Sequence, residues 1–184
     1  MSTRLVLASG SPRRRELLER AGLVPLVDPA GTDESVAAGE LPVAYAQRVA
    51  AEKLAAVAVR YPGHDVLAAD TVVDLDGMVL GQPLGDDDAR RMLRLLSGRT
   101  HSVHTAVAAV VGDERRAVTV TSLVTFHRLE EVRVDWYLGT GEPRGKAGGY
   151  AVQGLGIALV AGVAGSLSNV VGLPVPETLR LIRR

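Results

Sequence analysis

Short hydrophobic runs alternate along the chain with segments of helical periodicity. The runs are rich in Val, Leu and Ala and are bounded by turn residues, which predicts buried strands. They span residues 4–8, 66–73, 78–80, 101–111 and 117–126. Asp76-Gly77 and Gly112-Asp113 separate neighbouring runs and favour hairpin turns.

Amphipathic stretches between these runs predict five helices. At the first, Ser11 is expected to cap the helix and Gly22 to end it, and the second should end before Pro62. Helices and strands interleave, but two hairpins interrupt the βαβ order. The pattern therefore indicates an α/β fold with a mixed sheet. The five helices are expected to begin near Pro12, Pro42, Asp86, Glu130 and Pro176.

The composition narrows the class of protein. The chain of 184 residues suits a single domain over 1–184, and its 21 basic residues balance 21 acidic ones. That balance argues against a nucleic-acid-binding protein with a broad basic face. The chain has no cysteine, which excludes disulfides and thiolate chemistry, and the spacing of its four histidines does not favour zinc. With no membrane-length apolar run and no signal-peptide pattern, we expect a soluble cytoplasmic protein.

Three segments contain residues that the local structure does not favour. The first is Arg13-Arg14-Arg15, in the first turn of the first predicted helix. Each cation there opposes the helix dipole by about 0.3–1 kcal/mol. Free N–H groups and guanidinium groups together suit a phosphate. The alternative is a solvated charge run in a chain whose basic residues are nearly all arginine.

The second segment is the run 66–73, which contains Asp70. A carboxylate is costly to bury unless it is paired or binds a metal. We expect Asp70 at the end of a strand beside a cleft, where general bases and magnesium ligands are common. A solvent-facing acid is the alternative. Asp74 and Asp76 are weaker candidates, because turns favour Asp.

The third segment is the glycine-rich stretch 141–154, which contains Lys146. Its glycines let the backbone approach a ligand closely, and the lysine supplies a charge for phosphate. It is neither a Walker loop nor a dinucleotide fingerprint, since Ala147 follows the lysine and no G-x-G-x-x-G follows a strand. Tyr150 and Gln153 are candidates for contact with a base, and a mobile surface loop is the alternative. With Lys53 on a helix, the three segments together indicate a nucleotide-polyphosphate site.

The chain resembles the Maf family of nucleoside triphosphate pyrophosphatases, once named for inhibition of septum formation. The resemblance covers nearly the whole chain in order. It rests on LASGSPRRRELL at 7–18, DES at 33–35, AEK at 51–53, AADTVV at 68–73, LSGRTHSVHTAV at 96–107, KAGGYAVQG at 146–154 and SNVVGLP at 168–174.

The resemblance implies an elongated mixed β-sheet with flanking helices, in two lobes around a central cleft, an architecture related to inosine-triphosphatase-type enzymes. It implies a hydrolase that cleaves the α–β phosphoanhydride of a nucleoside triphosphate with Mg²⁺ or Mn²⁺. By analogy alone it also suggests a homodimer. Glu34 and Asp70 would bind metal or activate water, with Asp70 as proton acceptor. The residues that would hold the triphosphate are Ser9, Arg13, Arg14, Lys53 and Lys146.

Within the family, one subgroup prefers dTTP and UTP, and another prefers 7-methyl-GTP. The second carries SPWR at the first motif, SDQ at the acid motif and Glu at position 153. Arg13, Thr71 and Gln153 place this chain with the pyrimidine subgroup and are candidates for substrate selection. Modified pyrimidine triphosphates are further candidate substrates.

Two departures from the family pattern are Gln82, where many members have lysine, and Gly145, where many have aspartate. They bear on rate and metal affinity. Two alternatives to a pyrimidine pyrophosphatase stay open. One is a nucleotide-binding regulator of septum formation with weak turnover, and the other is a purine hydrolase of related architecture.

Overall fold

The computed structural model describes residues 5–183, whose centre is a seven-stranded mixed sheet. The strand order is β2-β1-β3-β5-β6-β7, and β4 pairs with β3 beside this path. β1 runs parallel to β2 and β3, and the other pairs are antiparallel. The predicted mixed sheet and both hairpins are confirmed. The strands are β1 Leu5–Leu7, β2 Leu26–Val27, β3 Asp65–Leu75, β4 Met78–Leu80, β5 Thr100–Val111, β6 Glu114–Phe126 and β7 Val160–Ala164.

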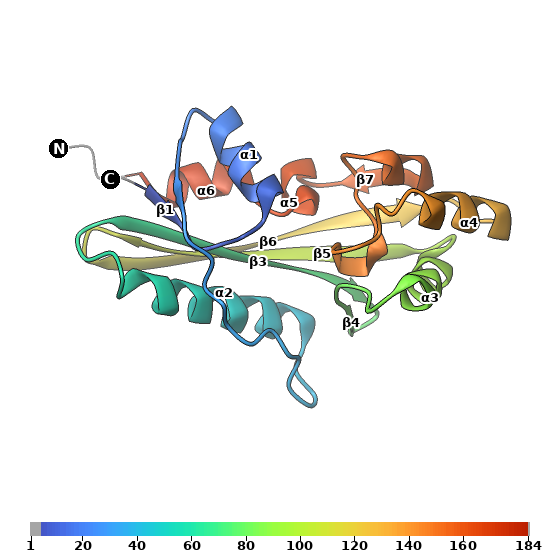
Figure 1. Cartoon of the computed structure of the whole chain (residues 1–184), viewed down its shortest axis with the longest axis horizontal. Coiled ribbons are helices and arrows are strands. Elements are labelled where there is room, and N and C mark those ends of the chain that lie inside the picture. The colour runs from blue at the N-terminus through green and yellow to red at the C-terminus, as the bar shows by residue number, and fades with distance from the viewer. Residues whose placement is uncertain (1–4, 184) are drawn as a thin grey trace.

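Six α-helices within the described part of the chain flank the sheet. α2 lies along one face, α1, α5 and α6 lie on the opposite side, and α3 and α4 gather at the far end of the long strands (Figure 1). None of these helices is long and apolar enough to cross a membrane. Their bounds are α1 Pro12–Arg20, α2 Pro42–Ala58, α3 Asp86–Leu96, α4 Glu131–Gly139, α5 Leu167–Val171 and α6 Val175–Leu181.

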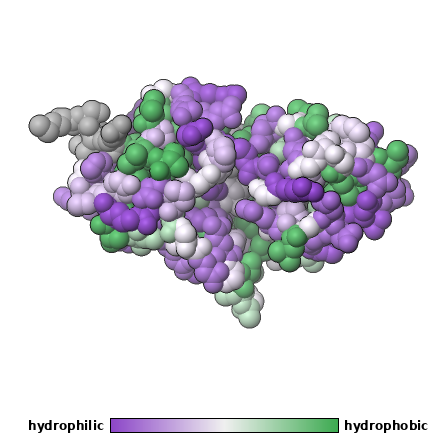
Figure 2. Space-filling model, viewed as in Figure 1, coloured by the Kyte–Doolittle hydropathy of each residue, from purple (hydrophilic) through white to green (hydrophobic). Residues whose placement is uncertain are grey.

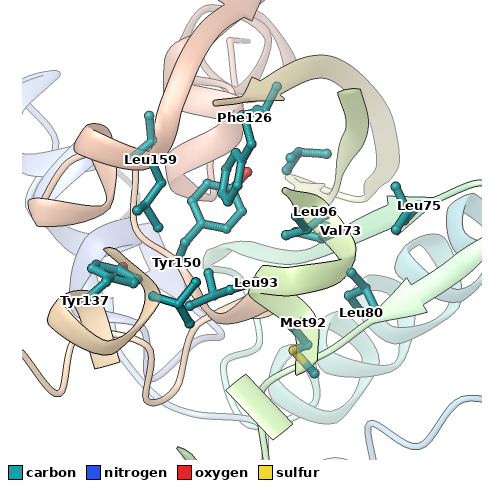
Figure 3. Packing of buried hydrophobic residues seen from close by; sticks show 14 residues of the cluster. Val73, Leu75, Leu80, Met92, Leu93, Leu96, Phe126, Tyr137, Tyr150 and Leu159 are labelled. Atoms are coloured by element: carbon teal, nitrogen blue, oxygen red, sulfur yellow. The ribbon is translucent and has the colours of Figure 1, made fainter. Parts of the chain in front are cut away.

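The alternation of side chains along the strands divides the core. Neighbouring residues of a strand point to opposite faces, so Val66 packs under α2 while Leu67 packs with Leu18 of α1. A third cluster joins the end of β3 to α3 and α4 and contains Leu93, Tyr137 and Tyr150 among others (Figure 3). Each large side chain buried in these clusters contributes about 1.5–3 kcal/mol. The three clusters lie on different parts of one sheet. The sheet therefore fixes the positions of the helices that pack on it.

Two short strands and one short α-helix were not predicted from the sequence. β2 has two residues between Pro25 and Pro29, and β7 reads Val-Ala-Gly-Val-Ala, mostly exposed and without polar alternation. α5 has only five residues, and the Ser166 side chain caps it by accepting from the Asn169 N–H. Strands and helices this short form through tertiary pairing rather than through a pattern of their own.

The expected cap of α1 is wrong in one respect. Ser11 occupies the N-cap position, and Pro12 is the first helical residue, but the Ser11 hydroxyl makes no capping hydrogen bond. Instead, the Ser11 N–H donates to the Ser9 hydroxyl at 3.2 Å. The first turn of α1 is therefore left without a side-chain acceptor of its own.

Candidate active site

A cavity of about 600 Å³ opens where segments distant in sequence meet beside β3. In the space-filling view the surface is hollowed between the two ends of the molecule, with hydrophilic side chains on both sides (Figure 2). The wall is formed by the start of α1, the loop before α2, α2 itself, β3, the glycine-rich segment and the end of α5. The site residues that the family resemblance implies all lie on this wall, whereas Arg15, Asp74 and Asp76 do not: the wall residues are Ser9, Arg13, Arg14, Glu34, Lys53, Asp70, Thr71, Lys146 and Gln153.

The pairing of β3 explains why the cavity lies there. On one edge of β3, pairing with β1 stops at Leu67 and pairing with β4 starts at Val73. Asp70 and Thr71 lie between those two points, where neither β1 nor β4 pairs with this edge of β3. Segments that pack on either face of the sheet can therefore reach the same opening. Asp70 is thus in the middle of an eleven-residue strand. The prediction that it ends a strand is wrong, because the hydrophobic run continues to Leu75.

Lys53 joins two carboxylates from different segments. Its Nζ lies 2.9 Å from Asp70 Oδ1 and 2.9 Å from Glu34 Oε1. Lys53 and Asp70 are both buried, whereas the Glu34 side chain is 46% exposed. α2 carries Lys53 toward the sheet on the face that also carries Val49 and Leu54, which makes a helical lysine a buried one. A buried cation with two acids is a group in which removal of one member leaves an uncompensated charge.

Asp70 is an acid in an unusual electrostatic environment. Burial raises its pKa above the usual aspartate range, and the attraction of Lys53 and Arg14 only partly offsets this. Its Oδ2 atom is buried and has no hydrogen-bond partner among the described residues. Asp70 therefore presents a free oxygen of raised basicity, which is what a proton acceptor or a metal ligand needs.

The three consecutive arginines do not act as one group. Arg14 is buried, and its Nε, Nη1 and Nη2 donate to the Gly172 carbonyl (2.9 Å), the Ser9 hydroxyl (3.0 Å) and the Thr71 hydroxyl (3.1 Å). Arg13 lies on the cavity wall, and its Nη2 is 3.5 Å from the Gly145 carbonyl. Arg15 is turned away and pairs with Glu19. Of the predicted anion site, Arg13 and Arg14 therefore lie on the cavity wall, where Arg14 also holds the loop around Ser9, and Arg15 does not.

Thr71 belongs to the same polar network. Its hydroxyl also meets the Thr105 hydroxyl at 2.9 Å, and Thr105 in turn donates to the Asn169 carbonyl at 3.0 Å. The Asn169 amide donates to the Val103 carbonyl and to the Ser122 hydroxyl. Buried, largely satisfied networks of this kind fix one arrangement of the segments they join. Thr71 therefore connects the cavity wall to β5 and α5.

The glycine-rich segment uses its conformational freedom for packing. Gly148 has φ of +68° and donates its N–H to the Gly81 carbonyl at 3.0 Å. A Cβ at this position would lie only 3.0 Å from the Val73 side chain. The close approach expected from the sequence is thus an approach to β3. It brings Lys146 and the exposed Gln153 to the cavity wall, where burial and the neighbouring Arg13 lower the pKa of Lys146.

Tyr45 is a wall residue that the sequence did not distinguish from the core. Its hydroxyl donates to the Glu34 carbonyl at 2.8 Å, which fixes the loop that carries this acid. Burial, together with the charges of Asp70 and Glu34, raises the pKa of Tyr45 to about 12. Its spacing with Val49 predicted only a buried helix position. The pairing with a loop eleven residues earlier leaves no signal in the sequence.

Comparison with known proteins gives one consistent result. The chain is 57% identical to a dTTP/UTP pyrophosphatase of Anaeromyxobacter dehalogenans strain 2CP-1, covering 100% of this chain and 95% of that protein. It is 51% identical to a dTTP/UTP pyrophosphatase of Myxococcus xanthus, covering 99% and 92%. Among solved structures, the Ham1 protein of Staphylococcus aureus aligns over 67% of this chain and 71% of its own, at 15% identity and a TM-score of 0.46, too distant a likeness to support an inference. The family model described as Maf-like protein matches residues 4–184. With the ordered motifs now gathered around one cavity, the chain belongs to the Maf-like protein family.

Proposed function

We propose that this protein is a dTTP/UTP pyrophosphatase, a hydrolase that cleaves the α–β phosphoanhydride of these nucleotides to a monophosphate and pyrophosphate. The observation that carries the proposal is the Asp70–Lys53–Glu34 group, which lines a cavity whose wall also carries Arg13 and Lys146. Relatives that carry this activity in their names match along the whole chain. A polyanion is the ligand that such a wall favours.

Two segments would hold the triphosphate. One is the start of α1, with Arg13 and an uncapped first turn whose free N–H groups attract anions. The other is the glycine-rich segment with Lys146, whose amine donates to the Arg144 carbonyl at 3.1 Å. Arg14 and Ser9 would fix the loop between β1 and α1 in the shape that the phosphates require. Lys53 would neutralise charge close to the reacting phosphorus.

Two carboxylates suit a divalent metal here. No group of three or more His, Asp or Glu residues between positions 5 and 183 could hold an ion by itself. Mg²⁺ often binds through one or two carboxylates and completes its shell with substrate phosphates and water. The unpartnered Oδ2 of Asp70 fits that role, with Glu34 as the second ligand. When bound, the metal would neutralise phosphate charge and polarise the phosphoryl oxygens.

Asp70 has the properties of a general base for the attacking water. The water oxygen would form a bond to phosphorus while the bond to the bridging oxygen of the pyrophosphate breaks. The water proton would pass to the carboxylate, whose raised basicity favours the transfer. Lys53 would keep Asp70 ionised before the reaction and orient its Oδ2 toward the cavity. The same oxygen cannot bind the metal and accept the proton at once, so where Asp70 acts as the base the metal would be held by Glu34 and the phosphates.

We expect turnover to be lost in EDTA and to return with Mg²⁺ or Mn²⁺. The two carboxylates lie beside the arginine and lysine side chains that would bind the triphosphate, so they would repel its phosphates. A divalent ion between the carboxylates and the phosphates removes this repulsion. The measurement is pyrophosphate release from dTTP before and after chelation, with Ca²⁺ as a further ion. Undiminished turnover in excess chelator would contradict a metal-assisted reaction.

The base selectivity of the site gives the direct test of the proposed function. Gln153 is exposed on the cavity wall, while the Thr71 hydroxyl already binds Arg14 and Thr105. We therefore assign base contact mainly to Gln153 and to Thr71 the support of Arg14. A panel of triphosphates should give the highest kcat/KM for dTTP and UTP, well above GTP and 7-methyl-GTP, because hydrogen-bonding sites reject partners that leave polar groups unpaired. Preference for a purine nucleotide would overturn the assignment.

Position 82 bears on the alternative of a binding protein with weak turnover. Gln82 lies on the cavity wall beside Gly145, and it cannot supply the cation that lysine would. We expect Gln82→Lys to raise kcat for dTTP, since a preorganised cation stabilises charge that develops in the transition state. Steady-state kinetics of this variant beside the parent measure the effect. A fall in KM with no rise in kcat would mean that position 82 only binds ground-state phosphate.

The homodimer suggested by family resemblance stays a prediction.

A further inference from the structure

The turn that carries Gln153 is held by two side chains that do not touch the cavity. We propose that Glu142, together with Tyr137, is a positioning residue that fixes Gln153 and thereby sets the base selectivity of the enzyme. The inference rests on the function proposed above, in which Gln153 contacts the base. It assigns a role to a carboxylate that lies outside the Asp70–Lys53–Glu34 group and is absent from the cavity wall.

Glu142 and Tyr137 accept hydrogen bonds from the backbone on both sides of Gln153. Glu142 Oε1 accepts from the Leu155 N–H at 2.9 Å, and Oε2 accepts from the Gly156 N–H at 2.8 Å. The Tyr137 hydroxyl donates to Glu142 Oε2 at 2.7 Å and accepts from the Ala151 N–H at 3.0 Å. Gln153 lies between Ala151 and Leu155, so the backbone on both sides of it is attached to the same Glu142–Tyr137 pair.

The backbone around the turn is shaped to admit this carboxylate. A Cβ added at Gly154 would lie 1.9 Å from Glu142 Oε1. A Cβ at Gly156 would lie 2.8 Å from the Tyr137 hydroxyl and 2.7 Å from the Ala151 carbonyl. Neither glycine has a left-handed φ, so neither is required by backbone conformation. Both are required by the space that the pair occupies.

The packing of Tyr137 in the core holds the Glu142–Tyr137 pair in place. It is fully buried and belongs to the core cluster that contains Tyr150 and Leu159 (Figure 3). Its aromatic ring is therefore held by packing, and its hydroxyl is at a defined place relative to α4. The Thr140 hydroxyl also accepts from the Glu142 N–H at 3.1 Å, which fixes the backbone of the acid itself. The orientation of Gln153 is thus determined by α4 and the core, not by the exposed turn.

The pair needs a charged carboxylate. Partial burial alone would raise the pKa of Glu142. The hydrogen bonds from Tyr137 and from the Gly156 and Leu155 amides outweigh this effect and hold the pKa below the usual glutamate range. Three donors converge on its two oxygens. A glutamine would present one oxygen and one NH₂ group, and at least one donor would then face another donor.

The experiment compares Glu142→Gln with the parent in the full-length enzyme. We expect the ratio of kcat/KM for dTTP over GTP to fall by about tenfold or more, since small displacements of a contacting group are costly. The kcat for dTTP at saturation should change by less than about threefold, because Asp70 and Lys53 keep their contacts. NMR-detected amide exchange should become faster at Leu155 and Gly156. Glu131→Gln, at an exposed acid of α4, the helix that carries Tyr137, is the matched control and should change neither quantity.

A double variant separates positioning from general support of the fold. If Glu142 acts through Gln153, Glu142→Gln/Gln153→Ala should lose no more selectivity than Gln153→Ala alone. Additive losses would overturn the proposal. Faster amide exchange with unchanged selectivity would also overturn it and leave Glu142 a structural residue. Tyr137→Phe, which keeps the buried ring and removes the hydroxyl, should lower selectivity as well and serves if Glu142→Gln does not fold.

Failure of the proposed function gives a different result. In that case the parent itself would release no pyrophosphate from dTTP, whatever the variants do. The ratio of Kd values for dTTP and GTP, measured by calorimetry on the parent and on Glu142→Gln, would then decide the positioning role. A parent that binds both nucleotides equally would overturn it.

Discussion

Replacement of Asp70 by asparagine is expected to lower kcat by about 10²–10⁴-fold, the usual contribution of a general base. Asparagine keeps the size of the side chain and its contact with Lys53 but cannot accept a proton from water. Binding of dTTP should persist or become tighter, because a negative charge close to the phosphates is removed. Single-turnover kinetics and a nucleotide Kd measured side by side distinguish these two effects.

The pH profile gives a second measure of the same residue. Because burial raises the Asp70 pKa, kcat/KM of the parent should rise with pH through a value above the ordinary aspartate pKa of about 3.9. That acid limb should be missing from the residual activity of Asp70→Asn. Asp74→Asn, on the same strand but outside the cavity, is the matched control. Near-parental kcat in Asp70→Asn would make Asp70 a structural acid and would end its assignment as the base.

Lys53→Ala is expected to destabilise the protein by about 3–5 kcal/mol, the typical result of removing one partner from a buried ion pair. Asp70 would keep its buried charge without the cation 2.9 Å away, and Glu34 would lose the same partner. Nucleotide binding should weaken too, since a phosphate partner is removed. Urea denaturation measures the first effect, and calorimetry with dTTP in the presence of Ca²⁺ measures the second.

The pH dependence of that destabilisation has a defined sign. Without Lys53, the Asp70 pKa in the folded state should rise further above its unfolded value. A group with a raised folded pKa gives its full stability below the unfolded pKa and loses it as pH rises through the folded value. The deficit of Lys53→Ala should therefore be larger at pH 8 than at pH 5. Lys53→Ala/Asp70→Asn should recover much of the stability but none of the activity, and an equal deficit at both pH values would contradict the buried-charge explanation.

Strong local patterns explain which elements were predicted correctly. The Asp76-Gly77 and Gly112-Asp113 turns join strands of regular hydrophobic character, and both hairpins form where the sequence indicates. β2, β7 and α5 were missed because each is too short to have a periodicity. β2 and β7 depend on pairing with β1 and β6, and α5 depends on hydrogen bonds from its Asn169 to Val103 and Ser122, all of which lie elsewhere in the chain.

The candidate site also has features that local sequence indicates and features that only tertiary packing determines. Residue types at fixed spacings, together with the family resemblance, identified the acids, lysines and arginines on the cavity wall. The sequence could not give the direction of each side chain. Arg13, Arg14 and Arg15 are adjacent, yet Arg13 lines the cavity, Arg14 lines it while buried against the Gly172 carbonyl, and Arg15 pairs with Glu19 at the surface. Successive helical residues point about 100° apart, so only the packing of α1 determines their separate roles.

The sequence by itself determined the chemistry that this protein can perform. The absence of cysteine, the two lysines and the acids in otherwise hydrophobic runs are properties of composition and local order, and local order suffices to recognise them. The tertiary structure alone decided which of these residues meet around one cavity. Asp70 meets Lys53 because α2 packs on the face of β3 to which Ala68, Asp70 and Val72 point, and Glu34 reaches the same lysine from the loop before α2. Gln153 is fixed by Glu142 and Tyr137, which approach it only after α4 has packed into the core. Contacts of this kind join residues through space, and no spacing along the chain records them.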